Sequence, residues 1–582
     1  MDEEKKDQAV DATVNESHEG PKEDHPETER QRKKRLKKEA KAAKKQKRKE
    51  KYESKSIVKE NLLAFLITFI LFVVSEYFTL TPINIRDKTF LMTLPCVLII
   101  FMILRLLFLH RFGKSNIILL TICALCVCMF YTGDYFSSKF FFAKEYANQI
   151  TLKKSNKFYE DMKNVKETQV PVVDKASAIK LGDKNMGSIS NYVSQFKVDK
   201  TYNQINYRGK PYRVTMLDYG SNIKWLTNHF DGLPAYIRVD MTTQDTEVVK
   251  LSKPIKYSKT DKIFRDINRY IRFRFPFSMF DSPSFELDEN GTPFWVAPVY
   301  TYKIGLFGGK DIIGAITVNA QNGQAKYYSV KKVPSWVDRV YPASLLMKQL
   351  KNMGKYSKGY LNTIFSQKGV LKPTSGYNYV AIGKDIWLTT GLTSVSGDSS
   401  NVGFALVNTR TKEGRYYPIS GATEASAMKS AAGKAQEHGY KPTFPILLNI
   451  ENVPTYFLSL KDNEGLVKKY AFVSVEHYET VGIGDTVKAA RDNYYKLMKE
   501  SGHLKESVPQ GSVTGKVTAI KDVVVNGTTT YYINVEGASN TFIASVTLND
   551  QLPTVQVGTN VTITYATGQE QALNALSVKI NG

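Results

Sequence analysis

The chain has 582 residues and a formal net charge of +24 at pH 7, because 80 lysines and arginines outnumber 56 aspartates and glutamates. This length allows several folded cores. Most of the positive excess lies beyond residue 136, which favours contact with anionic partners such as phosphate-bearing wall polymers, lipid headgroups or acidic proteins. All four cysteines lie in apolar runs, so the composition excludes a disulfide-stabilised exterior and favours a bacterial source.

Residues 1–57 form the first predicted segment, a cytoplasmic tail that is acidic and then basic. Residues 1–29 are acidic and almost free of apolar side chains, which predicts disorder. The stretch from Arg30 to Lys59 is rich in lysine and arginine and stops about one helical turn before the first apolar run. Basic residues near a membrane surface contribute ~1 kcal/mol each to the binding of anionic lipids. We therefore expect the Arg30–Lys59 stretch to bind anionic membrane lipids.

Three apolar runs lie within residues 58–136 and begin at Leu62, Phe90 and Asn116. Each is close to the ~20 residues that a helix needs to cross ~30 Å of hydrocarbon. A cleaved secretory signal is excluded, because a long polar tail precedes the first run and two more runs follow it. No acidic or histidine residue lies in the middle of a run, which argues against a transport path. The runs predict a three-helix membrane anchor.

Charge predicts the orientation of this anchor. The basic tail precedes the first run, and Arg111 and Lys114 lie in the turn between the second and third runs. Positively charged loops stay in the cytoplasm. The pattern predicts a multi-pass plasma-membrane protein with a cytoplasmic N-terminus, in which everything after Phe136 is extracellular, as in a Gram-positive-like bacterium.

Residues 137–170 predict a helical stalk, and a repeated pattern follows. Four segments align without gaps, each with an alternating apolar strand, a polar turn and a second short strand. They are AYIRVDMTTQDTEVVKL from Ala235, GAITVNAQNGQAKYYSV from Gly314, GFALVNTRTKEGRYYPI from Gly403 and AFVSVEHYETVGIG from Ala471. This alignment places Asp240, Asn319, Asn408 and Glu476 at equivalent positions. An irregular period of one such unit indicates duplicated domains, namely modules 1 to 4 at 171–255, 256–335, 336–420 and 421–501.

Each module is predicted to hold a helix followed by three strands, with the helix covering one face of an antiparallel sheet. The helices are expected at Ile189–Phe196, Ile263–Ile271, Leu345–Leu350 and Thr423–His438, where apolar residues recur with helical spacing or alanine is frequent. A last helix is expected from Asp485, as its N-cap, to Ser501, with Gly502 as its stop.

This order of elements, together with GAITVNAQNGQAKYYSV and GFALVNTRTKEGRYYPI, resembles the PepSY domain of bacterial secreted and membrane proteins. The resemblance covers about residues 170–501. It implies a membrane-anchored α+β protein with repeated antiparallel-sheet-plus-helix modules that bind or restrain an envelope peptidase or contact the wall. It implies no catalytic residues, so none are assigned.

After a linker at 502–511, residues 512–582 contain five short alternating strands, which predict an all-β barrel that resembles the OB type. The barrel carries only Lys516, Lys521 and Lys579 against four acidic residues. Because phosphate contacts provide most non-specific affinity for nucleic acid, we expect that this barrel does not bind it.

Motifs that could carry chemistry are incomplete. Ser426–Lys429 and Ser329–Lys332 fit S-x-x-K, but the S-D-N and K-T-G elements of penicillin-binding enzymes are missing. The four histidines after residue 136 lack metal-site spacing, and the cysteines lack partner ligands. Tryptophans occur about once per module, which favours core roles over a glycan groove. The residues in question are His229, His438, His477, His503, Cys96, Cys123, Cys126, Cys128, Trp225, Trp295, Trp336 and Trp387.

The sequence therefore predicts a non-catalytic membrane-anchored envelope protein without cofactor or metal, whose exterior modules bind or scaffold an envelope protein or an anionic wall polymer. Two alternatives stay open. One is an envelope peptidase or wall transferase whose site is assembled across modules. The other is a protein that handles nucleic acid at the cell surface through its basic surface and barrel.

Overall fold

The computed structural model describes residues 29–109, 112–162, 170–187, 194–395, 397–436, 439–503, 510–525, 528–566 and 572–581. The acidic part of the predicted tail, up to residue 28, lies outside the described residues. The chain divides into two compact units. The first comprises residues 1–137 together with the short segments 271–279 and 305–308, and the second comprises the remainder.

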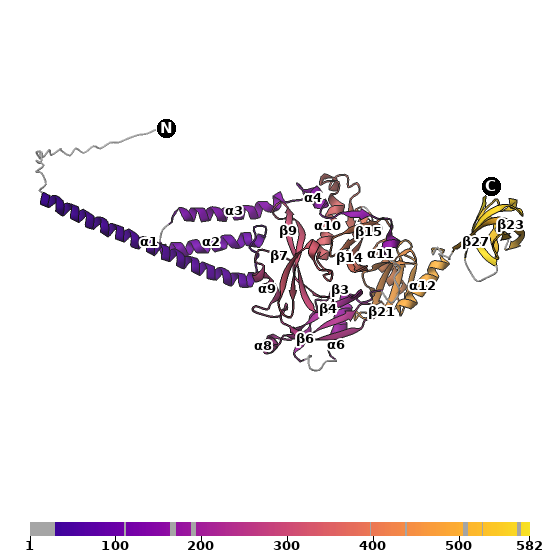
Figure 1. The fold of residues 1–582 in the computed structure, drawn as a ribbon, viewed down its shortest axis with the longest axis horizontal. Helices are drawn as coiled ribbons and strands as arrows, with labels where there is room; N and C mark the ends of the chain where they lie inside the picture. The colour runs from indigo at the N-terminus through magenta and orange to yellow at the C-terminus, as the bar shows by residue number, and fades with distance from the viewer. Residues whose placement is uncertain are drawn as a thin grey trace, which may run out of the picture. The chain divides into compact units, whose positions relative to one another are not determined.

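Three helices dominate the first unit: α1 (Glu29–Thr79), α2 (Lys88–Leu109) and α3 (Lys114–Phe136). They lie side by side in Figure 1. The apolar part of α1, from Ile57, has 23 residues, and α2 and α3 have 22 and 23. At 1.5 Å per residue each is roughly 33 Å long, enough to cross ~30 Å of hydrocarbon. The prediction of three membrane-spanning helices is confirmed, and the chain is a membrane protein.

Polar groups fix the ends of these helices. Asp87 caps α2, because its Oδ1 accepts hydrogen bonds from the backbone amides of Thr89 and Phe90. Near the other end of α2, Arg105 donates to Ser115 Oγ at 2.9 Å and to Asn116 Oδ1 at 3.2 Å on α3. These bonds satisfy charged and polar groups that would be costly to leave unpaired in lipid.

Two segments from module 2 belong to the helical unit. Arg272, on α9 (Ile267–Arg274), donates through Nε to the carbonyl of Leu80, directly after α1, at 2.8 Å. The segment 305–308 attaches to the end of α3, where Ser137 Oγ accepts from the amides of Leu306 and Phe307. Two segments of the predicted module 2 therefore belong to the same compact unit as the three helices.

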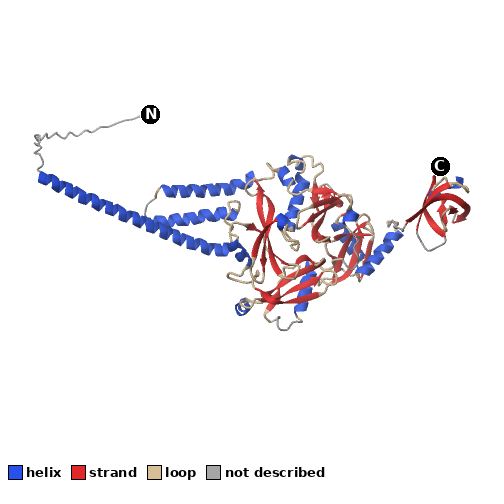
Figure 2. Ribbon diagram, viewed as in Figure 1, coloured by secondary structure: helices blue, strands red, loops and turns tan. Residues whose placement is uncertain are grey.

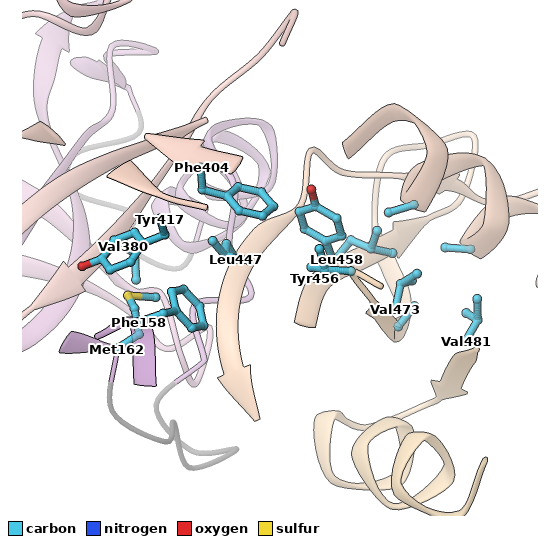
Figure 3. Packing of buried hydrophobic residues seen from close by; sticks show 14 of the residues in the cluster. Phe158, Met162, Val380, Phe404, Tyr417, Leu447, Tyr456, Leu458, Val473 and Val481 are labelled. Carbon is cyan, nitrogen blue, oxygen red and sulfur yellow. The ribbon is translucent and has the colours of Figure 1, made fainter. Parts of the chain in front are cut away.

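The predicted stalk is wrong. Residues 138–162 contain α4 (Ala143–Ala147), β1 (Leu152–Lys154) and α5 (Phe158–Asp161). Strand β1 pairs in parallel with β16 (Gly414–Tyr417), and the Phe158 ring lies 5.4 Å from the Tyr417 ring. Figure 3 shows Phe158 and Met162 in the cluster of buried residues that contains Tyr417. Burying these two apolar side chains favours packing on the sheet over an extended stalk.

The second unit contains four sheets that share one strand order. Each has five successive strands in common. The second and third form a hairpin, the first also pairs with the third, and the fourth and fifth follow on the other side of the third. Module 1 has β2 (Phe196–Val198), β3 (Asn203–Tyr207), β4 (Lys210–Tyr219), β5 (Leu233–Asp240) and β6 (Thr246–Ile255). Module 2 has β7 (Met279–Phe280), β8 (Ser284–Leu287), β9 (Pro293–Ile304), β10 (Gly308–Asn319) and β11 (Ala325–Ser329).

The other two modules repeat this order. Module 3 has β12 (Leu371–Pro373), β13 (Asn378–Ile382), β14 (Asp385–Ser394), β15 (Gly397–Asn408) and β16, with β17 (Gly421–Ala422) added beside β15. Module 4 has β18 (Lys441–Pro442), β19 (Ile446–Ile450), β20 (Val453–Lys461), β21 (Val467–Ser474) and β22 (Val481–Gly484). The sheets of modules 1, 2 and 4 thus have five strands and that of module 3 has seven, where the sequence predicted three in each. The predicted order left out the short edge strand after each helix and the last strand.

A recurrent backbone hydrogen bond closes each module. The residue after the long central strand accepts, through its carbonyl, from the segment that enters the helix. The four bonds run from Val172 to Met241, from Tyr257 to Ala320, from Tyr341 to Thr409 and from Ala422 to Val475, at 2.7, 3.0, 2.8 and 2.7 Å. The same bond at four places indicates that the four modules are structural repeats.

These bonds correct the alignment of the fourth repeat. In module 3, Asn408 Oδ1 ends the central strand by accepting from the amides of Arg410 and Thr411, and Asp240 and Asn319 do the same in modules 1 and 2. The equivalent residue in module 4 is Ser474, whose Oγ accepts from the amide of His477 at 3.0 Å. The predicted equivalent, Glu476, lies two residues later and is exposed.

The predicted positions of the helices match the observed helices in some modules and not in others. Residues 345–350 lie in α10 (Ala343–Tyr356), and Thr423 caps α11 (Glu424–Lys434). Module 1 carries α6 (Lys175–Met186), whereas the expected helix at 189–196 falls largely outside the described residues and its last residue, Phe196, is in a strand. The last helix, α12 (Val487–Glu500), is capped by Thr486 and not by Asp485, because the Thr486 hydroxyl accepts from the amide of Ala489. It packs on β21 and β22.

Neighbouring modules share their cores. One cluster of buried residues joins Val296 and Ile312 of module 2 to Leu346 and Leu388 of module 3. Another joins Phe404 of module 3 to residues of module 4, as Figure 3 shows for Tyr456, Leu458 and Val473.

The last five strands close on themselves in the order β23, β24, β25, β27, β26. Their bounds are Gln510–Val525, Thr528–Val535, Thr541–Ser545, Asn560–Ala566 and Ala572–Asn581. Strands β25 and β27 are parallel, and the other pairs are antiparallel. These strands appear red in Figure 2. Residues 504–509 of the predicted linker lie outside the described residues.

Candidate anion-binding cavity

A cavity of about 250 Å³ lies where modules 1, 3 and 4 meet. Module 1 contributes the segment 171–175 at the start of α6, Arg213 on β4 and Met241. Module 3 contributes the loop and first residue of β13, and module 4 contributes parts of β19 and β20 and the turn before them. The remaining lining residues are Tyr377, Asn378, Thr443, Phe444, Ile446, Phe457 and Ser459.

Two cations line this cavity, Lys175 and Arg213, and the guanidinium of Arg213 has unused hydrogen-bond donors. Its Nε donates to the carbonyl of Val173 at 3.0 Å, which fixes the direction of the guanidinium. Among the described residues, neither of its Nη groups has a hydrogen bond or an ion-pair partner. Burial lowers the pKa of Arg213 to about 10, so the side chain stays charged at neutral pH. A charged fork with unused donors suits a carboxylate or phosphate oxygen.

The nearest carboxylate, Asp174, lines the same cavity and offsets part of the charge of Arg213 without a direct ion pair, because its oxygens bond to other partners. Asp174 caps α6 by accepting from the amide of Ser177 at 2.8 Å, and it pairs with Lys461 at 2.5 Å. Burial raises the pKa of Asp174, but the bonds from Lys461 and Ser177 outweigh burial and leave this pKa below its usual value. Asp174 and Lys461 thus form an ion pair between modules 1 and 4. The Nη donors of Arg213 are left for another anion.

The rest of the wall combines apolar surface with satisfied polar groups. Ser459 Oγ donates to the carbonyl of Val172 at 3.2 Å, and Asn378 Nδ2 donates to the carbonyl of Phe444 at 3.1 Å. Phe444 and Phe457 supply the aromatic part of the lining. A cavity of this size, with two cations, one carboxylate and a lining that is part apolar and part polar, suits a small anionic group.

Electrostatic interactions link Arg213 to Arg339, and link Lys259 to Arg339 and Lys175 as well as to the carboxylate of Asp199. We call Lys175, Arg213, Lys259 and Arg339 the basic cluster. The Lys259 ammonium lies 5.3 Å from the centre of the Trp295 ring. Burial lowers the pKa of Lys259, and the charges of Arg339 and Lys175 add to this effect. Arg339 donates to Asn203 Oδ1 at 2.9 Å and also opposes the charge of Arg213. Cations that repel one another at the junction of three modules attract a polyanion.

A second polar cluster is closed off from solvent. Glu286 is fully buried and Asp338 is 3% exposed. The amide of Asp338 donates to Glu286 Oε2 at 2.9 Å, and Asp338 Oδ2 accepts from the amide of Asn206 at 2.6 Å. Burial and then the charge of Glu286 raise the pKa of Asp338. The pair joins modules 1, 2 and 3, and neither residue lines the cavity.

The structure places the S-x-x-K matches in structural roles. Ser426 lies in the first turn of α11, and its amide donates to the cap, Thr423. Ser329 is the last residue of β11, and Lys332 follows in a short 3-10 helix. Neither serine lines the cavity.

Two of the four histidines come together although they are far apart in the sequence. The rings of His477 and His503 stack with their centres 3.5 Å apart. His229 stacks on Trp225, and His438 lies outside the described residues. In the part of the chain that the structure describes, no group of three or more His, Cys, Asp or Glu side chains is placed to hold a metal ion.

The tryptophans divide into two pairs. Trp295 and Trp387 are buried in the cores of modules 2 and 3, as the sequence predicted. Trp225 and Trp336 are half-buried.

Sequence reasoning missed the cavity because its residues form no local motif. Ser459 and Val172, which share a hydrogen bond in its wall, are 287 positions apart. The one available signal is the arginine at position 213, in a strand whose following residues are apolar. No family model matches the sequence, and a search of curated proteins finds no relative. The class that the fold defines is a membrane protein with three spanning helices and a large multi-sheet region.

Proposed function

We propose that this chain is a non-catalytic, membrane-anchored protein of a bacterial cell envelope, and that the cavity at Arg213 holds an anionic group of its partner. The modules act as PepSY-like binding domains and the last five strands as an OB-like barrel, both outside a Gram-positive-like cell. The partner is an anionic wall polymer or an acidic envelope protein. On the cytoplasmic side, the Arg30–Lys59 stretch binds anionic lipids.

The observation that carries this proposal is the charged guanidinium of Arg213, which lines the cavity and whose Nη groups have no hydrogen-bond or ion-pair partner among the described residues. Arg213 is half-buried, and a guanidinium with unused donors can pair with the oxygens of a phosphate or carboxylate. The surrounding basic cluster supplies longer-range attraction for a polymer with repeated charges. The buried pair Glu286 and Asp338 supports no competing enzyme site, because it is shielded from the cavity.

The test uses the purified full chain in nanodiscs and an oligomer of glycerol phosphate as the probe. Isothermal titration should detect binding by the wild-type chain. Arg213→Gln should weaken binding about tenfold or more, since hydrogen bonds to charged groups contribute about 1.5–3 kcal/mol. Arg213→Lys should retain part of the affinity, because it keeps the charge and loses the fork.

Arg208→Gln is the matched control, because Arg208 is an exposed arginine in the same module whose Nε donates to the carbonyl of Glu289. It should bind as the wild type does. An acidic peptide used as a second probe separates the two partner classes. Equal binding by Arg213→Gln and the wild type, for both probes, would overturn the proposal.

A further inference from the structure

An exposed apolar patch surrounds α8 (Asn222–Asn228) in the second unit. Its members are large apolar side chains that are largely open to solvent: Ile223 (73% exposed), Leu226 (62%), Phe230 (72%), Ile263 (47%) and Phe264 (71%). Ile223 and Leu226 are three residues apart and so lie on one face of the helix. A contiguous exposed group of this kind marks an interaction surface. We call it the α8 patch.

The patch is built by specific contacts. Trp225 Nε1 donates to Asp261 Oδ1 at 3.2 Å, and the Lys262 ammonium bonds to Asn222. Arg265 donates to the carbonyl of His229. These bonds hold α8 against the loop 261–265, so the two segments that carry the exposed apolar side chains stay together.

The loop 261–265 is held in a strained conformation. Ile263 has a φ of 57°, a region that β-branched residues rarely enter. Arg269 Nη1 donates to the carbonyl of Ile263 at 2.6 Å and stabilises this turn. The result is that Ile263 and Phe264 are exposed. Strained backbone that presents apolar side chains to solvent indicates a functional contact.

Chain connectivity brings the α8 patch close to the membrane. Phe264 is three residues before α9, and Arg272 on α9 bonds to the carbonyl of Leu80, one residue beyond the first membrane span. With ~3.5 Å per extended residue and 1.5 Å per helical residue, the Cα atom of Phe264 lies within about 20 Å of the Cα atom of Arg272. On the segment 271–279, Phe277 is also largely exposed.

Charge complementarity favours a lipid partner. Exposed or half-buried cations flank the apolar side chains, namely Lys224, Lys262, Arg265 and Arg269. The acid of this loop, Asp261, is turned inward and is 4% exposed. Aromatic rings at the headgroup level with cations beside them are typical of surfaces that lie in the membrane interface.

We propose that the α8 patch docks on the lipid headgroup region of the membrane that holds α1, α2 and α3. Its apolar side chains enter the interface, and its cations contact anionic headgroups. This surface is distinct from the cavity at Arg213, and its docking does not depend on which partner the cavity takes.

The test is lipid photo-crosslinking of the full chain in nanodiscs that each hold one copy. The nanodiscs contain phosphatidylcholine and phosphatidylglycerol with a photoactivatable phosphatidylglycerol, and adducts are mapped by mass spectrometry. In the wild type we expect adducts on peptides covering 222–230 and 261–265. The double variant Phe230→Glu, Phe264→Glu should lose them. Val524→Glu, which changes an exposed apolar residue of the barrel, should keep them.

A second measurement reports the surroundings of the patch directly and does not depend on a variant that loses contact with lipid. An environment-sensitive dye on a Phe230→Cys variant, with the four native cysteines replaced by alanine, should emit at shorter wavelength in nanodiscs and be quenched by doxyl-labelled lipid. The same dye on a Val524→Cys variant should do neither. Absence of adducts on the wild-type peptides, adducts unchanged in the double variant, or a shielded dye that lipid does not quench would each overturn the proposal, the last because a protein surface would then cover the patch.

Discussion

At the scale of single residues, the buried carboxyl groups at the module junction make stability depend on pH. The folded chain raises the pKa of both Asp338 and Glu286, chiefly through burial. In the unfolded chain these groups ionise near pH 4. The pKa of each group is higher in the folded chain than in the unfolded chain. Their contribution to the free energy of unfolding is therefore fully present at low pH and is lost as the pH rises above about 4.

Asp338→Asn should remove this loss of stability at higher pH. The asparagine side chain is neutral at every pH, and its oxygen can still accept from the backbone amide of Asn206. We expect the variant to be more stable than the wild type at pH 7.5 and to differ little from it at pH 4.5. Chemical denaturation of the full chain in detergent at the two pH values measures the difference. Asp492→Asn, at an exposed aspartate, is the control. A variant destabilised equally at both pH values would show that the ionised carboxylate is the form that the junction needs.

At the scale of elements, the corrected fourth repeat can be tested at its turn. Ser474→Ala should destabilise the protein by about 1 kcal/mol, because the amide of His477 loses its acceptor. Glu476→Ala should have almost no effect, since that side chain is exposed. Unfolding midpoints in denaturant compare the two variants, and the reverse order of their effects would restore the ungapped alignment.

The segment that the sequence presented as a stalk gives a second test. Phe158 is 2% exposed and packs on Tyr417, whereas its neighbour Tyr159 is 43% exposed. Phe158→Ala should cost about 3–5 kcal/mol of stability, and Tyr159→Ala should cost much less. The denaturant midpoint of each variant provides the measurement. If the two costs are equal and small, the segment is not part of the core.

The elements also show what local patterns could and could not predict. Length and hydropathy were enough for the spanning helices, and periodicity was enough for α10. The three-residue strand β1 carries too little pattern to be seen, and its parallel partner lies more than 250 positions later. The fourth alignment failed because backbone bonds, and not residue spacing, define the end of β21. Arg213 was missed for the same reason, since three distant modules supply the cavity around it.

At the scale of the whole molecule, shared cores decide how the modules unfold. The cluster that contains Val296 and Leu346 joins modules 2 and 3, so a fragment of residues 256–335 exposes apolar surface that is buried in the full chain. We expect this fragment to show no cooperative thermal transition by circular dichroism, while a fragment of residues 138–503 should unfold cooperatively. A sharp transition for 256–335 would mean that module 2 is an independent domain.

The central claim is that the three helices anchor a large binding region on the outside of the cell. The most direct measurement is protease treatment of intact cells that express the chain with one epitope tag before Met1 and another after Gly582. The account predicts that the protease removes the tag after Gly582 and digests the chain beyond Phe136, while the tag before Met1 is degraded only after the cells are lysed. Protection of the C-terminal tag in intact cells would contradict the orientation and the proposed envelope partners with it.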